Sequence, residues 1–467
     1  MRLGIDFGTA YTRMAALTAD GLVYSGSAWP GPIPGILACC PATGQIYFGT
    51  EANEVDRNEV LVWPNFKLDL WQNPETVIGN LDFEKIMAAY LAFLKQQIPL
   101  GSGQAIEAVT LSMPAYCSIN TRNRLYNALH QVFADAAISL LPEPLSILLG
   151  YQALHPQQEL AGDILLIDFG DGRVSFSIMS LVSNRRELIL ETQLEMDQGI
   201  ELDSFVHAVL GPHAQALGLS GKEGWRFNCI ILAGGASHTP EVLPQIKALF
   251  PDVPLFQGQP DQPYTAVGNC LWATSGLQLF TICPFQFYIA RKNPQAEEGY
   301  ELEPIPFDTI NLELDITRTY RIFSLPVTSP YNLAKNPGDV EIKIYAADEA
   351  PGRSPETLPP RELVLHWEQA DYNGAEVVHI HYDLASSQLF VNFSDNLLAS
   401  PEVELFHGWK ARQLAQSLWL SDYKHVDKDL LKALQKQLQS NPGESAYNNQ
   451  LMTTYYKLLC VLQILNP

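Results

Sequence analysis

Two short stretches of the sequence could together bind a phosphate chain. In each, an apolar strand ends in an aspartate and a glycine turn follows: residues 3–9 (LGIDFGT, with Asp6) and residues 166–172 (LIDFGDG, with Asp168). A strand-end aspartate can hold a hydrated metal ion, and a glycine turn lets backbone N–H groups approach phosphate oxygens. Capping of a strand end is the plainer interpretation of either aspartate alone. The pair of turns predicts a nucleotide site between two related parts of the fold.

The elements around these turns follow an α/β pattern. Apolar residues at i, i+4, i+7 and i+8 predict helices around 86–94 and 125–133. Short apolar runs at Ala108–Met113 and Cys229–Ala233 are typical of strands buried on both faces. We therefore expect alternating strands and helices, with an α/β fold class, up to about residue 275.

The character of the chain changes after that point. Residues 276–282 are expected to form a linker between a nucleotide-binding α/β domain at 1–275 and a strand-rich domain at 283–400. Apolar and polar residues alternate with period two over 377–384, which predicts a half-exposed strand. Leucine and tyrosine stripes at helical spacing predict a helical tail at 401–467.

Composition and net charge limit the kinds of partner that the protein is expected to bind. The chain has 467 residues, enough for several domains, and a formal net charge of −22. That charge argues against binding to nucleic acid or anionic membranes. The sequence has no basic leader and no apolar run of about 18 residues, so no membrane insertion is expected. Its 7 scattered cysteines are typical of reduced thiols, and we expect a cytoplasmic protein.

Five pieces of sequence, taken in order, carry a family resemblance. They are residues 4–14, residues 109–116 before a helix with two arginines, residues 141–144, residues 166–170 and residues 232–240. This order resembles the seventy-kilodalton heat-shock (DnaK-type) chaperone family, which shares the actin–hexokinase nucleotide fold. The resemblance implies an actin-like, two-lobed ATPase domain, a β-sandwich domain that binds extended peptides, and a short helical segment. It also implies ATP or ADP and Mg²⁺ as ligands.

The same resemblance implies catalytic and metal roles for four side chains. Asp6 and Asp168 would hold Mg²⁺ from opposite lobes. Lys67 would reach the γ-phosphate, and Glu143 would orient the attacking water. A lone lysine after an aromatic residue is, however, more typical of a solvated surface position. If ATP is hydrolysed, these are the residues that we expect to act.

Backbone groups and two basic side chains complete the implied nucleotide site. The first turn would contact the β- and γ-phosphates, the second would approach them, and a later glycine pair would lie against the adenosine. Arg173 and His238 would stand beside the phosphates and the adenine. The glycine-turn residues are Gly8, Thr9 and Ala10, then Gly170 and Gly172, then Gly234 and Gly235.

The sequence also departs from the family pattern. Arg173 could act as an arginine finger or occupy the place of the metal ion, and Ser175 stands where a carboxylate is expected. Between Gly172 and Gly234 there is room only for a hairpin near 174–195 and one helix near 201–210. The subdomain that covers the adenine in the family would be mostly missing. Weak nucleotide binding and slow or absent hydrolysis are therefore expected.

Three functions remain open at this point. The first is an ATP-dependent chaperone-like protein, in which the nucleotide state controls binding of an unfolded or specific client protein, with a co-chaperone as a further partner. The second is a non-catalytic scaffold on the same fold, with weak or no nucleotide binding. The third is a sugar or small-metabolite kinase, which the strand-rich second part disfavours. A plain β-sandwich without a peptide channel fits the alternating strands as well as a peptide-binding one.

Overall fold

The structure is a computed structural model that describes residues 1–394 apart from short gaps. The residues that are not described, besides 395–467, are 28–30, 59, 68–69, 71–76, 78–80, 99–104, 115–116, 118, 171–172, 196–201, 222–223, 261, 282–284, 297, 305–313, 317–318, 327–328, 336–338, 349–360, 368–376, 384 and 387. The predicted helical tail at 401–467 thus lies outside the described residues.

The chain has a mixed α/β fold and divides into two compact units, Met1–Thr281 and Ile282–Pro467. Part of the expected linker at 276–282 is a strand, because β17 (Gln278–Thr281) pairs in parallel with β12 (Arg185–Glu195). None of the described helices is long and apolar enough to cross a membrane.

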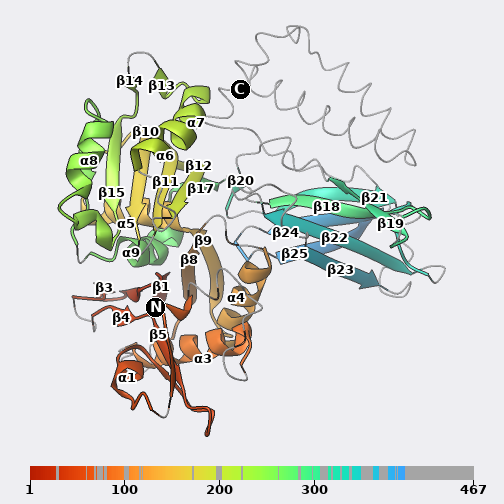
Figure 1. The fold of residues 1–467 in the computed structure, drawn as a ribbon. Helices are drawn as coiled ribbons and strands as arrows, with labels where there is room; N and C mark the ends of the chain where they lie inside the picture. The colour runs from red at the N-terminus through yellow and green to blue at the C-terminus, as the bar shows by residue number, and fades with distance from the viewer. Residues whose placement is uncertain are drawn as a thin grey trace. The chain divides into compact units, whose positions relative to one another are not determined.

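The first main sheet of the first unit has the strand order β3-β2-β1-β8-β9, with β4 beside β2 (Figure 1). β1 is antiparallel to β2 and parallel to β8, and β8 is parallel to β9. β8 coincides with the apolar run that predicted it. The bounds are β1 (Arg2–Phe7), β2 (Tyr11–Thr18), β3 (Gly21–Tyr24), β4 (Ile33–Pro34), β8 (Ala108–Met113) and β9 (Ala137–Pro142).

The second main sheet repeats this order as β12-β11-β10-β15-β16, with β17 beside β12. Here β10 is antiparallel to β11 and parallel to β15, as β1 is to β2 and β8. The hairpin expected near 174–195 and the strand at Cys229–Ala233 are confirmed. The bounds are β10 (Gly162–Phe169), β11 (Arg173–Val182), β12 (Arg185–Glu195), β15 (Cys229–Ala233) and β16 (Leu255–Gln257).

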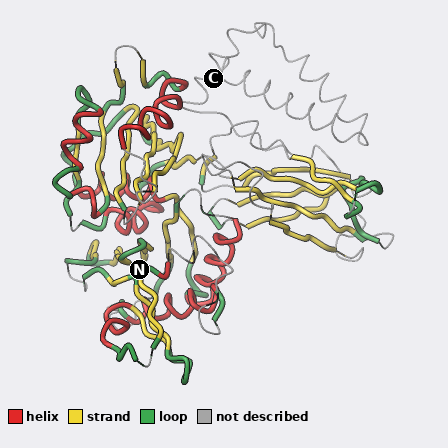
Figure 2. The backbone as a smooth tube through the Cα atoms, in the orientation of Figure 1, coloured by secondary structure: helices red, strands yellow, loops and turns green. Residues whose placement is uncertain are grey.

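In both halves of the first unit, helices connect one parallel strand to the next along the chain (Figure 2). α4 leads from β8 to β9 and α5 follows, while α8 leads from β15 to β16 and α9 follows. The helix near 201–210 is short and contains a π-helical turn, η2 (Val206–Leu210). The other bounds are α1 (Gly49–Glu54), α3 (Phe83–Gln96), α4 (Ile119–Val132), α5 (Glu143–Leu154), α6 (Leu202–Phe205), α7 (Gly211–Ala216), η3 (Gly235–His238), α8 (Val242–Leu249), α9 (Tyr264–Leu271) and η4 (Trp272–Thr274).

The first half carries an additional small sheet, and the second half a short hairpin. The small sheet has the order β6-β5-β7, and the hairpin pairs β13 with β14. Their bounds are β5 (Ile36–Cys39), β6 (Ile46–Phe48), β7 (Leu61–Pro64), β13 (Ser220–Gly221) and β14 (Gly224–Trp225).

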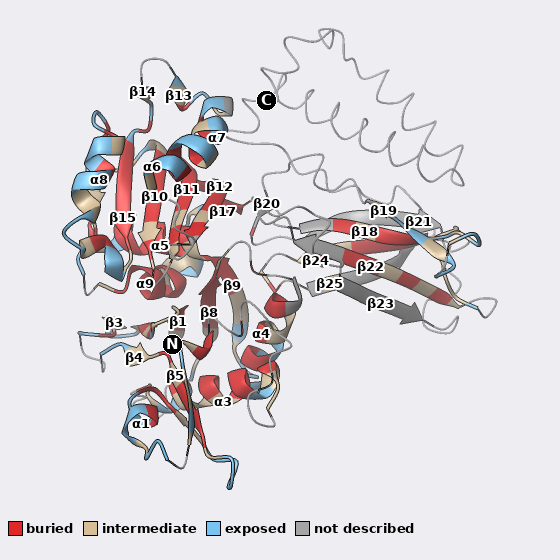
Figure 3. Cartoon of the chain, viewed as in Figure 1, coloured by how far each residue is buried: buried red, intermediate tan, exposed pale blue. Residues whose placement is uncertain are grey.

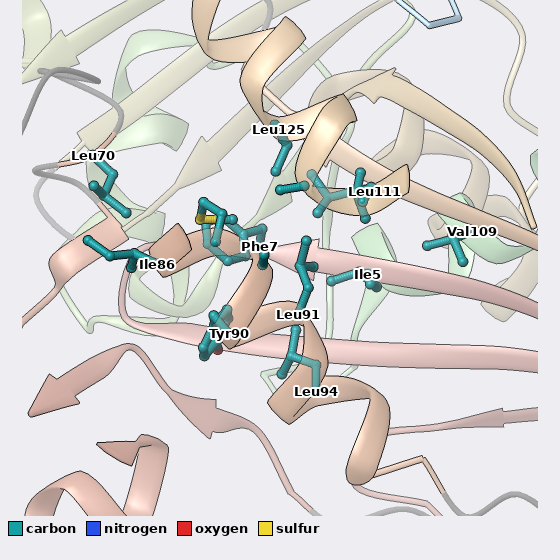
Figure 4. Close-up of a cluster of buried hydrophobic side chains, with 14 of the residues drawn as sticks. Ile5, Phe7, Leu70, Ile86, Tyr90, Leu91, Leu94, Val109, Leu111 and Leu125 are labelled. Atoms are coloured by element: carbon teal, nitrogen blue, oxygen red, sulfur yellow. The ribbon is translucent and has the colours of Figure 1, made fainter. Parts of the chain in front are cut away.

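A hydrophobic core joins α3 to the first sheet. α3 begins after Asp82, whose side chain accepts a hydrogen bond of 3.0 Å from the Lys85 N–H and so caps the helix. Its apolar stripe places Tyr90 and Leu94 in the core cluster, close to Phe7 of β1 (Figure 4). The rings of Phe7 and Tyr90 meet edge to face, with centroids 5.5 Å apart. The predicted helical periodicity of this segment is confirmed.

α5 and α9 cross with almost no side chains between them. A Cβ atom at Gly268 would lie 1.8 Å from the carbonyl oxygen of Ser146, and one at Gly150 would lie 1.8 Å from that of Tyr264. On the other side of α9, a Cβ atom at Gly4 of β1 would lie 2.1 Å from a carbonyl oxygen. Figure 3 shows the crossing as buried, along with the central strands of both sheets. Glycine is required at these three positions because backbone packs directly on backbone.

A buried polar chain fixes the same crossing. Asn269 of α9 donates from Nδ2 to the carbonyl oxygen of Ile5 over 2.7 Å, and its Oδ1 accepts from the hydroxyl of Ser146 over 2.6 Å. Asn269 therefore links β1, α5 and α9. Because each of these buried groups has a partner, the chain stabilises one arrangement of the three elements.

The second unit contains two antiparallel sheets, with the orders β19-β18-β22-β23 and β21-β24-β25. The rings of Phe287 and Tyr382, one from each sheet, lie 5.4 Å apart. The period-two segment forms β24 as predicted, but both of its faces are largely buried, His379 included. The bounds are β18 (Phe285–Lys292), β19 (Tyr300–Pro304), β20 (Leu314–Asp315), β21 (Thr319–Pro326), β22 (Val340–Asp348), β23 (Arg361–Trp367), β24 (Val377–Asp383) and β25 (Gln388–Ser394).

Candidate functional site

A cleft of about 530 Å³ opens in the first unit, where the carboxyl ends of β1 and β10 meet. The β1–β2 turn, the first residue of α5 and the start of β11 line it. The end of β15, η3 and residues 258–260 and 262–265 line it as well. Backbone and small side chains make up much of this wall. The cleft has room for a ligand of the size of a nucleotide.

Asp6 and Asp168 occupy matching places in the two sheets and both line this cleft. Each is the next-to-last residue of the central strand, β1 or β10, and each is followed by a phenylalanine and a glycine. Burial and the negative charge of Asp6 together raise the pKa of Asp168 to about 7, so the two carboxylates are close enough to repel. The two glycine turns therefore converge on one space.

The environment of Asp6 includes several donors and cations. Its carboxylate accepts a hydrogen bond from the Gly8 N–H, and its Oδ2 lies 4.0 Å from Nη1 of Arg13, the residue opposite it on β2. Burial raises the pKa of Asp6, while the charges of Arg13 and Lys67 oppose that rise. Asp168 differs, since the residue opposite it on β11 is Ser175.

Glu143 is the first residue of α5 and lies on the same cleft. Burial raises its pKa well above the usual range, and the charges of Asp168 and Asp6 add to the rise, while Arg173 opposes it. The raised pKa favours the protonated form of Glu143, in which the carboxyl group donates a hydrogen bond and does not accept a proton from water.

Lys67 does not line the cleft. Its side chain is fully buried, its Nζ donates to the Thr12 hydroxyl over 2.8 Å, and Nζ lies 4.7 Å from the centre of the Phe7 ring. The expectation of a solvated surface lysine is wrong, because the aromatic core described above encloses it. Burial lowers the pKa of Lys67 to about 7, although the charge of Asp6 opposes this. In this geometry Nζ of Lys67 is held by Thr12, outside the cleft lining.

The predicted glycine-turn residues line the cleft wherever they are described. They are Gly8, Thr9, Ala10, Gly170, Gly234 and Gly235, with Arg173 and His238 beside them, while Gly172 lies outside the described residues. Gly234 has φ +82°, and a Cβ atom there would lie 2.5 Å from Oδ1 of Asp168. Only glycine allows η3 to begin this close to the carboxylate. The Gly170 N–H is used by the turn itself, since it donates to the Arg173 carbonyl over 2.8 Å.

Two features of the cleft wall have no part in the roles that the resemblance implies. Arg13 is one, although it stands within the first motif. The other is the segment of residues 258–260 and 262–263. Tyr264 holds it by accepting a 2.7 Å hydrogen bond from the Gln259 N–H, and the Tyr264 hydroxyl contacts His155 over 2.9 Å. An alternating strand pattern that places Arg13 opposite Asp6 could have predicted the role of Arg13. No local sequence pattern predicts the segment before Tyr264, because α5 and α9 bring its parts together.

The donor set does not fit a magnesium ion bound directly by side chains. Within the described part of the chain, no group of three or more His, Cys, Asp or Glu side chains is placed to hold a metal ion. The positive charge of Arg13 already acts on both Asp6 and Asp168, and that of Arg173 acts on Glu143. Each carboxylate thus has a guanidinium near it where the resemblance implies a metal ion.

Comparison with protein-family models and with curated proteins found no match for this chain.

Proposed function

We propose that the first unit is an actin-like, two-lobed nucleotide-binding domain that binds ATP or ADP in the cleft. One observation carries this proposal: two sheets with the same strand order bring Asp6 and Asp168, at equivalent strand ends, to one cleft. A likeness of topology alone would be weak evidence for function. Here the matching positions also carry glycine turns and face each other.

The placement of a nucleotide follows from the shape and charge of the wall. The phosphates would lie between the turn at 8–10 and Gly170, where Arg13 and Arg173 supply positive charge. The adenosine would lie against Gly234 and Gly235, with His238 beside the base. The segment of residues 258–260 and 262–263 would form the opposite wall and take the place of the missing adenine-covering subdomain.

Binding, rather than hydrolysis, is the activity that the site supports best. The raised pKa of Glu143 favours its protonated form, which is not a base for water, and Nζ of Lys67 donates to Thr12. Nucleotide binding needs only the turns, the glycines and the positive charges. Hydrolysis by this domain would therefore be slow.

For the whole chain we propose an ATP-dependent, chaperone-like role in the cytoplasm. The two antiparallel sheets of the second unit, with Phe287 and Tyr382 between them, are compatible with a β-sandwich that binds an extended segment of a client protein. The nucleotide state of the first unit would control that binding, and a co-chaperone would be a further partner.

Titration calorimetry of the full chain with ATP, ADP and inorganic tripolyphosphate tests the proposal. We expect micromolar dissociation constants for ATP. The variant His238→Ala should weaken ATP binding while it leaves tripolyphosphate binding unchanged, because only the nucleotide has a base. Absence of heat with ATP at millimolar concentration would contradict the proposal.

A second candidate, a scaffold without nucleotide chemistry, is favoured by two observations at Lys67 and Glu143. Lys67 lies outside the cleft lining and donates to Thr12, and the raised pKa of Glu143 favours its protonated form. The same titration separates the two candidates, since a scaffold predicts no heat with any of the three ligands.

A further inference from the structure

Arg13 is held at the centre of the cleft by the pairing of β1 with β2. The register of the two strands places it directly opposite Asp6, and both residues line the cleft. Cross-strand neighbours share one face of a sheet, so the guanidinium and the carboxylate stay together whatever ligand is present. The position of Arg13 is a consequence of the hairpin and does not depend on a mobile loop.

The guanidinium of Arg13 has hydrogen-bonding capacity left over. Its contact with Asp6, 4.0 Å from Nη1 to Oδ2, is longer than a hydrogen bond. Its Nε is buried and has no hydrogen-bond partner among the described residues. An arginine has five N–H donors in a planar fork that matches phosphate oxygens. A buried donor without a partner is unfavourable, and an anionic ligand would relieve this cost.

The positive charge of Arg13 acts on both aspartates and on Lys67. It opposes the rise in the pKa of Asp6 and of Asp168 that burial causes, and it adds to the fall in the pKa of Lys67. A divalent cation held by Asp6 and Asp168 would have to share this space with a fixed positive charge. Repulsion would then weaken the binding of the metal ion.

We propose that the guanidinium of Arg13 binds the phosphate groups directly, in place of a divalent cation, so that nucleotide binding in this cleft does not require Mg²⁺. The proposal rests on the nucleotide-binding function proposed above and specifies its chemistry. Arg173, at the second turn, adds a second positive charge from the other side of the cleft. Two arginines supply the charge that Mg²⁺ otherwise provides to a polyphosphate.

Calorimetric titration of the full chain with ATP and with tripolyphosphate, in EDTA and in excess Mg²⁺, tests this. The wild-type chain should bind each ligand with dissociation constants that agree within about threefold in the two buffers. Arg13→Met keeps an unbranched side chain but removes the guanidinium and its charge, and it should weaken binding in EDTA by about tenfold or more. Arg226→Met is the matched control, because Arg226 is exposed and lies outside the cleft lining.

Arg13→Lys keeps the positive charge, so it distinguishes the loss of charge from a loss of binding that misfolding causes. It should bind ATP in EDTA more tightly than Arg13→Met, and thermal unfolding should show that both variants are folded. If wild-type binding appears only in Mg²⁺, the proposal for Arg13 is wrong and the nucleotide-binding function stands. If neither buffer gives binding, the proposed function itself fails, and this inference with it.

Discussion

The two halves of the first unit have the same topology but different chemistry at their matching strand ends. Opposite Asp6 the first half places Arg13, and Lys67 and the Gly8 N–H lie close as well. Opposite Asp168 the second half places Ser175, and Gly234 packs against the carboxylate. The first half therefore places two cations close to its aspartate, while the second half places a serine and close-fitting backbone beside Asp168. Two copies of one strand order have become complementary sides of one cleft.

The largest effect is expected where the two halves join. Gly268→Ala would place a Cβ atom 1.8 Å from the Ser146 carbonyl oxygen and force α5 and α9 apart. We expect a loss of about 3 kcal/mol or more in the free energy of unfolding, measured with urea. Gly211→Ala is the control, since its Cβ atom would meet nothing closer than 3.4 Å. If both variants lose the same stability, direct backbone contact does not join the two halves.

The second effect distinguishes the two aspartates. The folded-state pKa of Asp168, about 7, is above its ordinary value of 3.8, so its contribution to stability is full below pH 4 and is lost as the pH rises to 7. Asp168→Asn should raise the free energy of unfolding at pH 8 by roughly 2 kcal/mol and flatten its fall between pH 4 and 7. Asp6→Asn should gain less, because Arg13 and Lys67 offset the burial of Asp6. A larger gain for Asp6→Asn would contradict the contrast drawn between the halves.

The third prediction is a pH dependence of stability that Lys67 causes, and Lys67 belongs to the first half alone. The unfolded lysine keeps its proton up to about pH 10.5, whereas folded Lys67 releases it near pH 7. Between these values the unfolded chain binds more protons, so stability should rise with pH by up to about 1.4 kcal/mol per unit. Lys67→Met should lack this rise in urea titrations from pH 7 to 10. Lys247→Met, at an exposed position, should retain it.

The smallest effect compares the two turns directly. A Cβ atom at Gly8 would lie 2.8 Å from the Tyr11 carbonyl oxygen, whereas one at Gly170 would lie 3.6 Å from that of Arg173. Gly8→Ala should therefore lower the free energy of unfolding by about 1 kcal/mol, and Gly170→Ala should change it by less than about 0.5 kcal/mol. The reverse order in urea unfolding would show that the first turn is the more tolerant of the two.

Local patterns were sufficient to predict much of this fold. Helical periodicity predicted α3 and α4, and apolar runs predicted β8 and β15. The paired Asp-Phe-Gly turns indicated two related halves. These features depend on neighbours in sequence, which is why they could be recognised without coordinates.

The rest depends on contacts between distant segments. The burial of Lys67 follows from an aromatic cluster that combines β1, β6 and α3 with its neighbour Phe66, and most of that cluster lies far from Lys67 in the sequence. The pairing of β17 with β12 joins residues about ninety positions apart. Gly150 and Gly268 left a weaker signal: a glycine inside a helix is unfavourable, so its presence indicates a packing reason.

The contact of backbone on backbone at Gly4, Gly150 and Gly268 also limits how the chain can diverge. Most core positions can exchange one apolar residue for another during evolution, but these three admit no side chain at all. Proteins of common descent whose overall similarity has faded should still share this trio, spaced as it is around the two Asp-Phe-Gly turns. A search for that spacing is a route to relatives of this chain that comparison over its full length does not find.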